Sequence, residues 1–203
     1  FGGAPTELLG AAVARSFFQT TLCPCDVDGD GQLEILVSGN PGVVFWLDRC
    51  DGQWTEMPPL LKHGGDVRAE TLSVPCLADM DGDGDLDVVV GDSSGFLWYF
   101  ENTSGNSKLA LKAGRRLTCD GKVVHHIAGP TGSIQGPAEL RFGYTTPLVM
   151  DWDGDGKPDI LTNDIRGRYT WYRTAGRGNK LELTDPVLLT VHGKPFDGAW
   201  RAR

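Results

Sequence analysis

The sequence lacks the patterns that mark several common classes of protein. No apolar run approaches the roughly 18 residues that a transmembrane helix needs, so we expect no membrane span. There is no Gly-x-Ser-x-Gly elbow, no phosphate-binding loop and no His-Glu-x-x-His motif, which leaves serine hydrolase, nucleotide-binding and zinc protease functions without support. Lys and Arg do not cluster with aromatic residues, which argues against nucleic acid as a partner. The sequence starts at Phe1 and shows neither an initiator Met nor a signal-peptide pattern there, so we expect a processed or excised chain.

Negative charge is concentrated in three short stretches. The net charge is −8, and much of it lies in the nonapeptides 26–34, 79–87 and 151–159. Each nonapeptide carries carboxylates at its first, third, fifth and ninth places and glycine at its sixth. Without these twelve carboxylates the rest of the chain has a net charge of +4. The acidity is therefore local, and it requires a local explanation.

Four carboxylates within nine residues repel one another, and a glycine lets the backbone turn sharply enough to aim them at one point. Calcium takes six to eight oxygens at roughly 2.3 to 2.6 Å, and four carboxylates, one backbone carbonyl and water fill that shell. Magnesium retains its waters too firmly, and zinc prefers nitrogen or sulfur. The sequence therefore predicts three calcium sites, and calcium loops of millimolar to micromolar affinity favour an extracellular or cell-surface location.

An EF-hand loop begins in the same way, but it needs Glu at its twelfth place and helices on both sides. The twelfth residues here are Val37, Val90 and Thr162. Each is preceded by β-branched or aliphatic residues that favour a strand. We therefore expect calcium loops that connect strands.

The three loops belong to three similar units. In each unit a strand leads into the loop, a second strand leaves it, and a turn, an aromatic strand and a weaker last strand follow. This order, with almost no helical periodicity, predicts an all-β fold of about three four-stranded β-propeller blades at residues 16–65, 66–112 and 138–190. They form one segment spanning 1–203, with an insertion at 113–143. Because propellers close with about four to eight blades, we expect an oligomer or part of a larger propeller.

Recurrent aromatic residues predict contacts between blades. Trp46 and Trp171 stand at the same distance from their loops, and Tyr99 occupies the matching place in the second unit. Cysteine gives a weaker indication, because the chain has five, an odd number. Cys23 and Cys76 each lie three residues before a loop, where the third unit has Leu148, and this favours small core residues over ligands. Disulfide pairing stays open at this stage.

The loops, the strands that follow them and the glycine turns before aromatic strands resemble FG-GAP or VCBS repeats, including the calcium-bearing blades of the integrin α propeller. The resemblance covers about residues 16–190. It implies backbone carbonyl ligands at Gln32, Asp85 and Lys157, and it implies structural calcium in a module that binds a glycan or protein partner. The implied side-chain ligands are Asp26, Asp28, Asp30 and Glu34; Asp79, Asp81, Asp83 and Asp87; and Asp151, Asp153, Asp155 and Asp159.

The insertion raises one alternative from the enzyme class. Ile134–Pro137 and Phe142–Thr145 resemble short stretches of propeller-type polysaccharide lyases that act on uronate-containing chains, such as ulvan lyases. Lyase chemistry would need a base, an acid and a cation that neutralises the uronate carboxylate. The residues available for these roles are His125 or His126, Tyr144, and Arg141, Arg166 or Arg168. We favour the structural interpretation, in which the two histidines lie on opposite faces of a strand and Tyr144 packs between blades, and we assign no catalytic residue.

Overall fold

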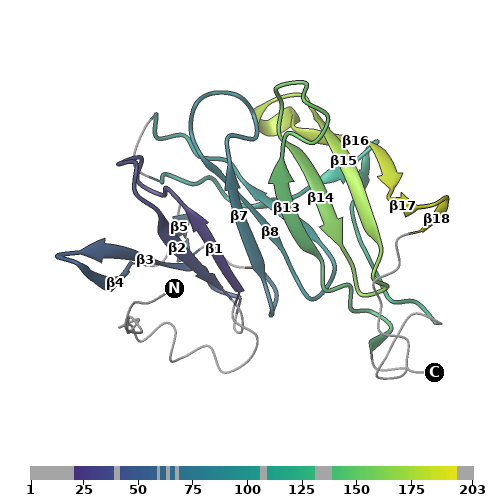
Figure 1. The fold of residues 1–203 in the computed structure, drawn as a ribbon, viewed down its shortest axis with the longest axis horizontal. Coiled ribbons are helices and arrows are strands. Elements are labelled where there is room, and N and C mark those ends of the chain that lie inside the picture. Colours follow the sequence, from purple (N-terminus) through teal and green to yellow (C-terminus); the bar gives the residue numbers. More distant parts are fainter. Residues whose placement is uncertain are drawn as a thin grey trace.

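The structure is a computed structural model, and it describes residues 21–38, 42–58, 60–62, 65–66, 69–105, 109–130 and 139–195 (Figure 1). The described residues form sheets of mostly antiparallel strands with almost no helix, which confirms the predicted all-β class. Two parts of the sequence predictions, the start of the first unit at 16–20 and the lyase-like stretch Ile134–Pro137, lie outside these residues. Within them, no helix is long and apolar enough to cross a membrane.

The first two sheets have four strands each, in sequence order. The first sheet contains β1 (Thr21–Cys25), β2 (Glu34–Ser38), β3 (Phe45–Cys50) and β4 (Gln53–Met57). The second sheet contains β7 (Val74–Ala78), β8 (Asp87–Gly91), β9 (Leu97–Phe100) and β10 (Arg115–Arg116). Each strand pairs antiparallel with the next, as expected for a propeller blade.

The third sheet is larger than predicted. It contains the expected four strands and two short ones from the segment that we described as an insertion. The four strands are β13 (Thr146–Met150), β14 (Asp159–Asn163), β15 (Tyr169–Ala175) and β16 (Glu182–Leu188), with the 3-10 turn η2 (Gly178–Lys180) before β16. The added strands are β11 (Thr118–Cys119) and β12 (Lys122–Val123). Two hairpins stand apart from the sheets: β5 (Leu61–Lys62) with β6 (Gly65–Asp66), and β17 (Thr190–Val191) with β18 (Lys194–Pro195).

The sheets lie side by side, and their first strands meet (Figure 1). β7 contacts β1 on one side and β13 on the other. This arrangement of innermost strands is that of neighbouring propeller blades, although the described residues do not close a ring.

The segment 109–130 links the second sheet to the third. Leu111 bridges Asn102, and β10 then pairs with β9, so this part of the chain forms the outer edge of the second sheet. The chain next crosses to the third sheet, where β11 pairs parallel with β16. It then returns to the second sheet, where the His126 amide donates to Gly95 O at 2.9 Å. Much of the predicted insertion therefore holds two blades together.

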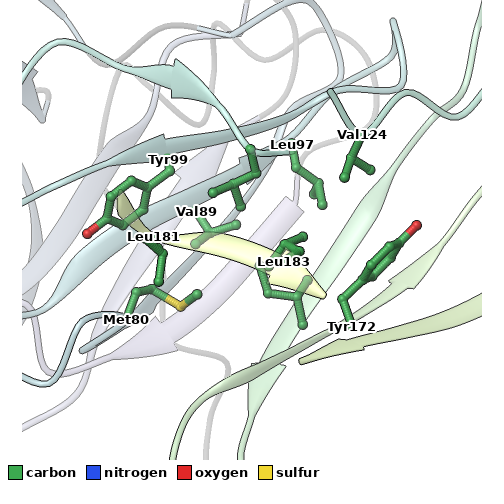
Figure 2. Close-up of a cluster of buried hydrophobic side chains, with 10 residues drawn as sticks. Met80, Val89, Leu97, Tyr99, Val124, Tyr172, Leu181 and Leu183 are labelled. Atoms are coloured by element: carbon green, nitrogen blue, oxygen red, sulfur yellow. The ribbon is translucent and has the colours of Figure 1, made fainter. Parts of the chain in front are cut away.

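Two apolar clusters fill the spaces between sheets. Between the second and third sheets, Met80, Val89 and Tyr99 face Leu181 and Leu183 (Figure 2). The cluster between the first and second sheets contains Val27, Leu36, Val44, Leu60, Val88, Val90, Phe100 and Leu111. Val89 faces one neighbour and Val88 and Val90 the other, because successive side chains of a strand alternate. The burial of each of these valine side chains stabilises the folded state by about 2 kcal/mol.

Matching rows of side chains cross each sheet, and the rows of the first two sheets face the following sheet. The rows are Cys23, Leu36 and Trp46; Cys76, Val89 and Tyr99; and Leu148, Leu161, Trp171 and Val187. Trp46 packs against the cluster of the first two sheets, and Tyr99 lies in the cluster of the second and third. The predicted contact between blades is thus confirmed at these two aromatic residues. We call the last set the third-sheet row; Leu148 is 51% exposed and Val187 is 40% exposed.

Candidate metal centres

The three acidic nonapeptides adopt nearly the same backbone conformation between the first and second strand of each sheet. In each, the first aspartate accepts the amide of the fourth residue at 2.7 to 2.8 Å with one oxygen. Its other oxygen accepts the amide of the sixth residue at 3.0 to 3.1 Å. These bonds wrap the chain around the carboxylate. The residues at the fourth and sixth places must then adopt the left-handed backbone conformation, which glycine adopts without strain. Gly82 and Gly84 of the second loop have φ of 75° and 95°, so the fourth place requires glycine as much as the predicted sixth does.

Carboxylates of the first, third and ninth places converge in every loop. One ligand atom from each lies within 4.8 Å of the others. The ninth-place carboxylate is buried and accepts the amide of the second loop residue, at 2.6 to 3.2 Å. The three triples are Asp26, Asp28 and Glu34; Asp79, Asp81 and Asp87; and Asp151, Asp153 and Asp159.

The fifth-place carboxylates lie outside these triples. Asp30, Asp83 and Asp155 are exposed, and each accepts the amide of the seventh residue two positions later. The seventh residues differ in their side-chain contacts. The Asp85 carboxylate accepts the Gly105 amide at 2.6 Å, whereas the Gln32 and Lys157 side chains turn back to the fifth-place carboxylate. Ligation by the fifth-place side chains and the seventh-place carbonyls stays a prediction.

The second loop is the most enclosed of the three. Asp87 is 1% exposed and accepts the Tyr99 hydroxyl at 3.0 Å and the Asn102 amide at 2.7 Å. Burial raises the pKa of Asp87 to about 7. Burial also raises the pKa of Asp81, and the nearby Asp83 charge adds to that shift.

One oxygen of Asp81 indicates that this loop can hold a cation. Oδ2 accepts the Gly178 amide from the third sheet at 2.9 Å, while Oδ1 is buried and has no hydrogen-bond partner. A buried carboxylate oxygen without a donor is destabilising, and a cation among the triple would supply the missing partner. The donor set is oxygen only, which suits a hard cation such as calcium. The residues present therefore fit the predicted ion.

The third loop has a different electrostatic environment. Arg173 Nε donates to Asp153 Oδ2 at 2.8 Å, and this bond lowers the pKa of Asp153. The residues that match Arg173 in the other sheets, two positions after Trp46 and Tyr99, are both acidic. They are Asp48, beside Glu34, and Glu101, beside Asp81. The third loop consequently offers a cation less net negative charge than the other two.

The histidines of the linking segment point to opposite sides, as the structural interpretation predicted. His125 is exposed and stacks on Phe96 with ring centroids 4.2 Å apart. His126 is partly buried; Nδ1 lies 2.9 Å from Thr145 Oγ1 and Nε2 lies 3.0 Å from the Tyr172 hydroxyl. Burial lowers the pKa of His126.

The other residues considered for lyase chemistry do not join His126. Tyr144 stacks on Phe142, with ring centroids 5.6 Å apart. Arg166 donates to the Ala128 carbonyl at 2.9 Å, and Arg141 and Arg168 are exposed. The partner of His126 is Tyr172, which sequence reasoning did not single out because it lies 46 residues away in an aromatic strand.

Comparison with known proteins agrees with this geometry. The model of the FG-GAP-like repeat matches residues 26–90, which contain the first two loops. Integrin alpha-3 of Cricetulus griseus is 24% identical over 207 residues, covering 91% of this chain and 18% of the relative. Integrin alpha-7 of Homo sapiens is 24% identical over 179 residues, covering 83% of this chain and 14% of the relative. The chain thus spans less than a fifth of the length of these relatives. The matched residues carry an FG-GAP-like repeat and the chain is similar to integrin α chains, which confirms the FG-GAP repeat family predicted from its sequence.

Proposed function

We propose that this chain is a calcium-binding β-propeller segment that works outside the cell and binds a protein or glycan partner, with calcium in a structural role. The observation that supports calcium most directly is the second loop. Its three carboxylates converge, and Asp81 presents a buried oxygen that lacks a partner. The similarity to integrin α chains supports the extracellular location and the role in ligand binding.

Calcium in this loop would stabilise more than its own hairpin. The ion would cancel the repulsion within the triple, and Asp81 would carry its effect to Gly178 in the third sheet. An ion that binds only the folded state stabilises it by about 4 kcal/mol at roughly a thousand times Kd. Binding energy at the second loop therefore appears as stability of two sheets.

A melting experiment tests the role of calcium. A chelator should lower the Tm of the full chain, and isothermal titration should detect up to three calcium ions. Asp81→Asn should remove the tightest binding event and reduce the calcium-dependent rise in Tm. Asp51→Asn, at an exposed turn outside the loops, serves as the matched control and should behave as the parent does. A melting curve that ignores both chelator and calcium would contradict the proposal.

A surface near the end of the sheet opposite the second calcium loop suits a ligand. Strands of the second sheet alternate in direction, so the turn between β8 and β9 lies far from the loop between β7 and β8. Beside that turn, Arg116 lies over the Phe96 ring at 3.6 Å, and His125 also stacks on Phe96. Because Arg116 and His125 cover the two faces of the Phe96 ring, the groups open to a partner are the exposed guanidinium and imidazole, which suit sugar rings and protein side chains alike. Arg116→Ala should weaken partner binding, whereas Lys122→Ala, an exposed cation on β12, should not.

The exposed apolar residues of the third-sheet row support the presence of a further blade that packs directly against the third sheet. The corresponding rows of the first two sheets pack against the next sheet, and the third-sheet row has no such cover within the described residues. We expect a blade from this or another chain to cover it, so the 203-residue chain should self-associate. Light scattering should give a mass above that of a monomer, and Leu148→Glu should lower it. A well-folded monomer in the parent chain would contradict this part of the proposal.

The alternative lyase function has one supporting observation and one against it. His126 and the Tyr172 hydroxyl are 3.0 Å apart, the spacing of a base and acid pair. Tyr172 is buried, however, so a polysaccharide has no direct access to its hydroxyl. Ultraviolet absorbance from unsaturated uronate would reveal lyase activity. Activity that persists in Tyr172→Phe would remove this pair from consideration.

A further inference from the structure

Four loops join into one surface at the end of the second and third sheets that lies opposite their acidic loops. We call this surface the loop face, and it consists of residues 92–96, 125–130, 139–145 and 164–168. The Ala128 amide donates to Phe142 O at 2.9 Å, and the Ile165 amide donates to Gly143 O at 2.7 Å. The Gly143 amide in turn donates to Ser93 O at 2.8 Å. These backbone bonds fix the four loops relative to one another.

The charged side chains that the loop face exposes are basic. Arg141, Arg168 and His125 are exposed. The exposed Arg116 of β10 adjoins the loop face, because its guanidinium lies over the Phe96 ring at 3.6 Å. The surface therefore offers hydrogen-bond donors for an anion from three of its loops and from a neighbouring strand.

The three acidic residues of the loop face do not balance these charges at its surface. Asp92 is buried and accepts the Trp98 indole N–H at 2.8 Å. Asp164 is partly buried and accepts two backbone amides of its own turn, at 2.8 and 3.1 Å. Glu139 is also buried. The exposed Glu70, shortly before β7, lies outside the loop face and borders it on the side of the first sheet.

The basic residues are close enough to contact one extended ligand. His125 is three residues from Ala128, a span of at most about 11 Å. Ala128 is hydrogen-bonded to Phe142, the neighbour of Arg141, and Arg168 belongs to a turn that is bonded to the same loop. A short chain that follows these loops can therefore meet several donors.

We propose that the loop face binds an anionic polysaccharide, with Arg141 and Arg168 on its acidic groups and Phe142 against a sugar ring. The inference rests on the proposed ligand-binding role and names the chemistry of the ligand. A guanidinium donates two parallel hydrogen bonds to a carboxylate and suits a sulfate equally well. Phe142 is 37% exposed and stacks on Tyr144 with ring centroids 5.6 Å apart, so its ring is held in place and partly open.

The backbone of the loop face favours a polysaccharide over an acidic peptide. An extended peptide that adds to a sheet as a strand needs free amides and carbonyls at the sheet edge. The loops bond many of these groups to one another, so recognition depends on side chains. A polysaccharide presents anions at regular intervals with apolar ring faces between them, which matches arginines on separate loops beside an exposed aromatic ring.

Isothermal titration of the full chain with defined polysaccharides tests this inference. The probes are hyaluronan, whose anions are carboxylates, dextran sulfate, whose anions are sulfates, and neutral dextran, all with calcium present. Hyaluronan or dextran sulfate should bind, with an affinity that falls as salt is added, and neutral dextran should not. The two anionic probes show which acidic group the loop face prefers.

Substitutions locate the binding surface. Arg141→Ala and Arg168→Ala should each weaken binding about threefold to fivefold, and the double variant about tenfold or more. Phe142→Ala should weaken binding without changing its salt dependence. Lys180→Ala removes an exposed cation of η2, at the end of the acidic loops, and is the matched control that should bind as the parent does. The Tm of each variant shows whether it is folded.

Several results would overturn the inference. They are an absence of binding to both anionic probes, equal binding of neutral dextran, tighter binding of poly-glutamate, and a loss in Lys180→Ala as large as that in Arg141→Ala. The titrations of the parent chain decide the first three even if a variant fails to fold. If the chelator lowers the Tm but no polysaccharide binds, this inference fails and the proposed calcium-binding role stands.

Discussion

Removal of calcium should reveal a pH dependence of stability to which Asp87 makes the largest contribution. In the calcium-free protein, burial raises the pKa of Asp87 from its ordinary value of 3.8 to about 7. The folded state therefore holds a proton that the unfolded chain releases at lower pH. For a raised carboxyl pKa, the added stability is fully present below the unfolded value and is lost as the pH rises through the folded value. The calcium-free protein should be more stable in mild acid than at neutral or alkaline pH.

The size of the effect follows from the shift. A shift of about three units corresponds to about 4 kcal/mol in the limit, at about 1.4 kcal/mol per unit. Between about pH 5 and about pH 8 the expected loss is about 3 kcal/mol, because part of the titration lies outside that window. Under the proposed function calcium should reverse the trend, since the ion would bind the ionised carboxylate. The calcium-induced rise in Tm should grow over the same range.

Urea unfolding in the presence of a chelator measures this directly. Asp87→Asn cannot titrate, so its free energy of unfolding should vary with pH by about 3 kcal/mol less than that of the parent. The raised pKa values of Glu34 and Asp81 persist in this variant and leave a smaller slope of the same sign. Asp155→Asn, at an exposed fifth place, is the control and should follow the parent. Equal pH slopes in the parent and Asp87→Asn would refute the reasoning.

Three further substitutions test contacts that the structure describes. Arg115→Ala should destabilise the chain by roughly 2 to 4 kcal/mol in urea unfolding, because it removes two hydrogen bonds to carbonyls in 178–181 and the cation over an aromatic ring. Arg173→Gln should tighten calcium binding at the third loop by freeing Asp153, and unchanged titration isotherms would show that the arginine has no influence. Gly95→Ala should lower the Tm by several degrees, since φ is 88° and an added Cβ would collide with a backbone carbonyl; a Tm equal to that of the parent would contradict this.

The features that the sequence predicts well are determined locally. Each acidic loop is encoded within nine consecutive residues, so the spacing of Asp79, Asp81 and Asp87 is sufficient to predict that their carboxylates converge. The strands on either side follow from β-branched runs such as 88–90. The sequence also predicts that Tyr99 and Trp46 occupy corresponding positions, because both lie at the same distance from their loops.

The features that the sequence does not predict depend on pairing across long separations. β11 has two residues and pairs with β16, so it offers no periodicity to recognise. Arg173 influences Asp153 from a different strand, and only the paired sheet reveals that its counterparts are acidic. Tyr172 lies in an aromatic strand that sequence reasoning treated as packing, and its hydroxyl contact with His126 requires three-dimensional proximity.

The crossing of 115–123 from one sheet to the next has a consequence for how this protein can be divided. Its first part completes the edge of the second sheet and its later part extends the third, so no cut between them leaves both units whole. Although the loops recur at intervals like independent repeats, the units of the second and third sheets must be expressed or transferred to another protein together.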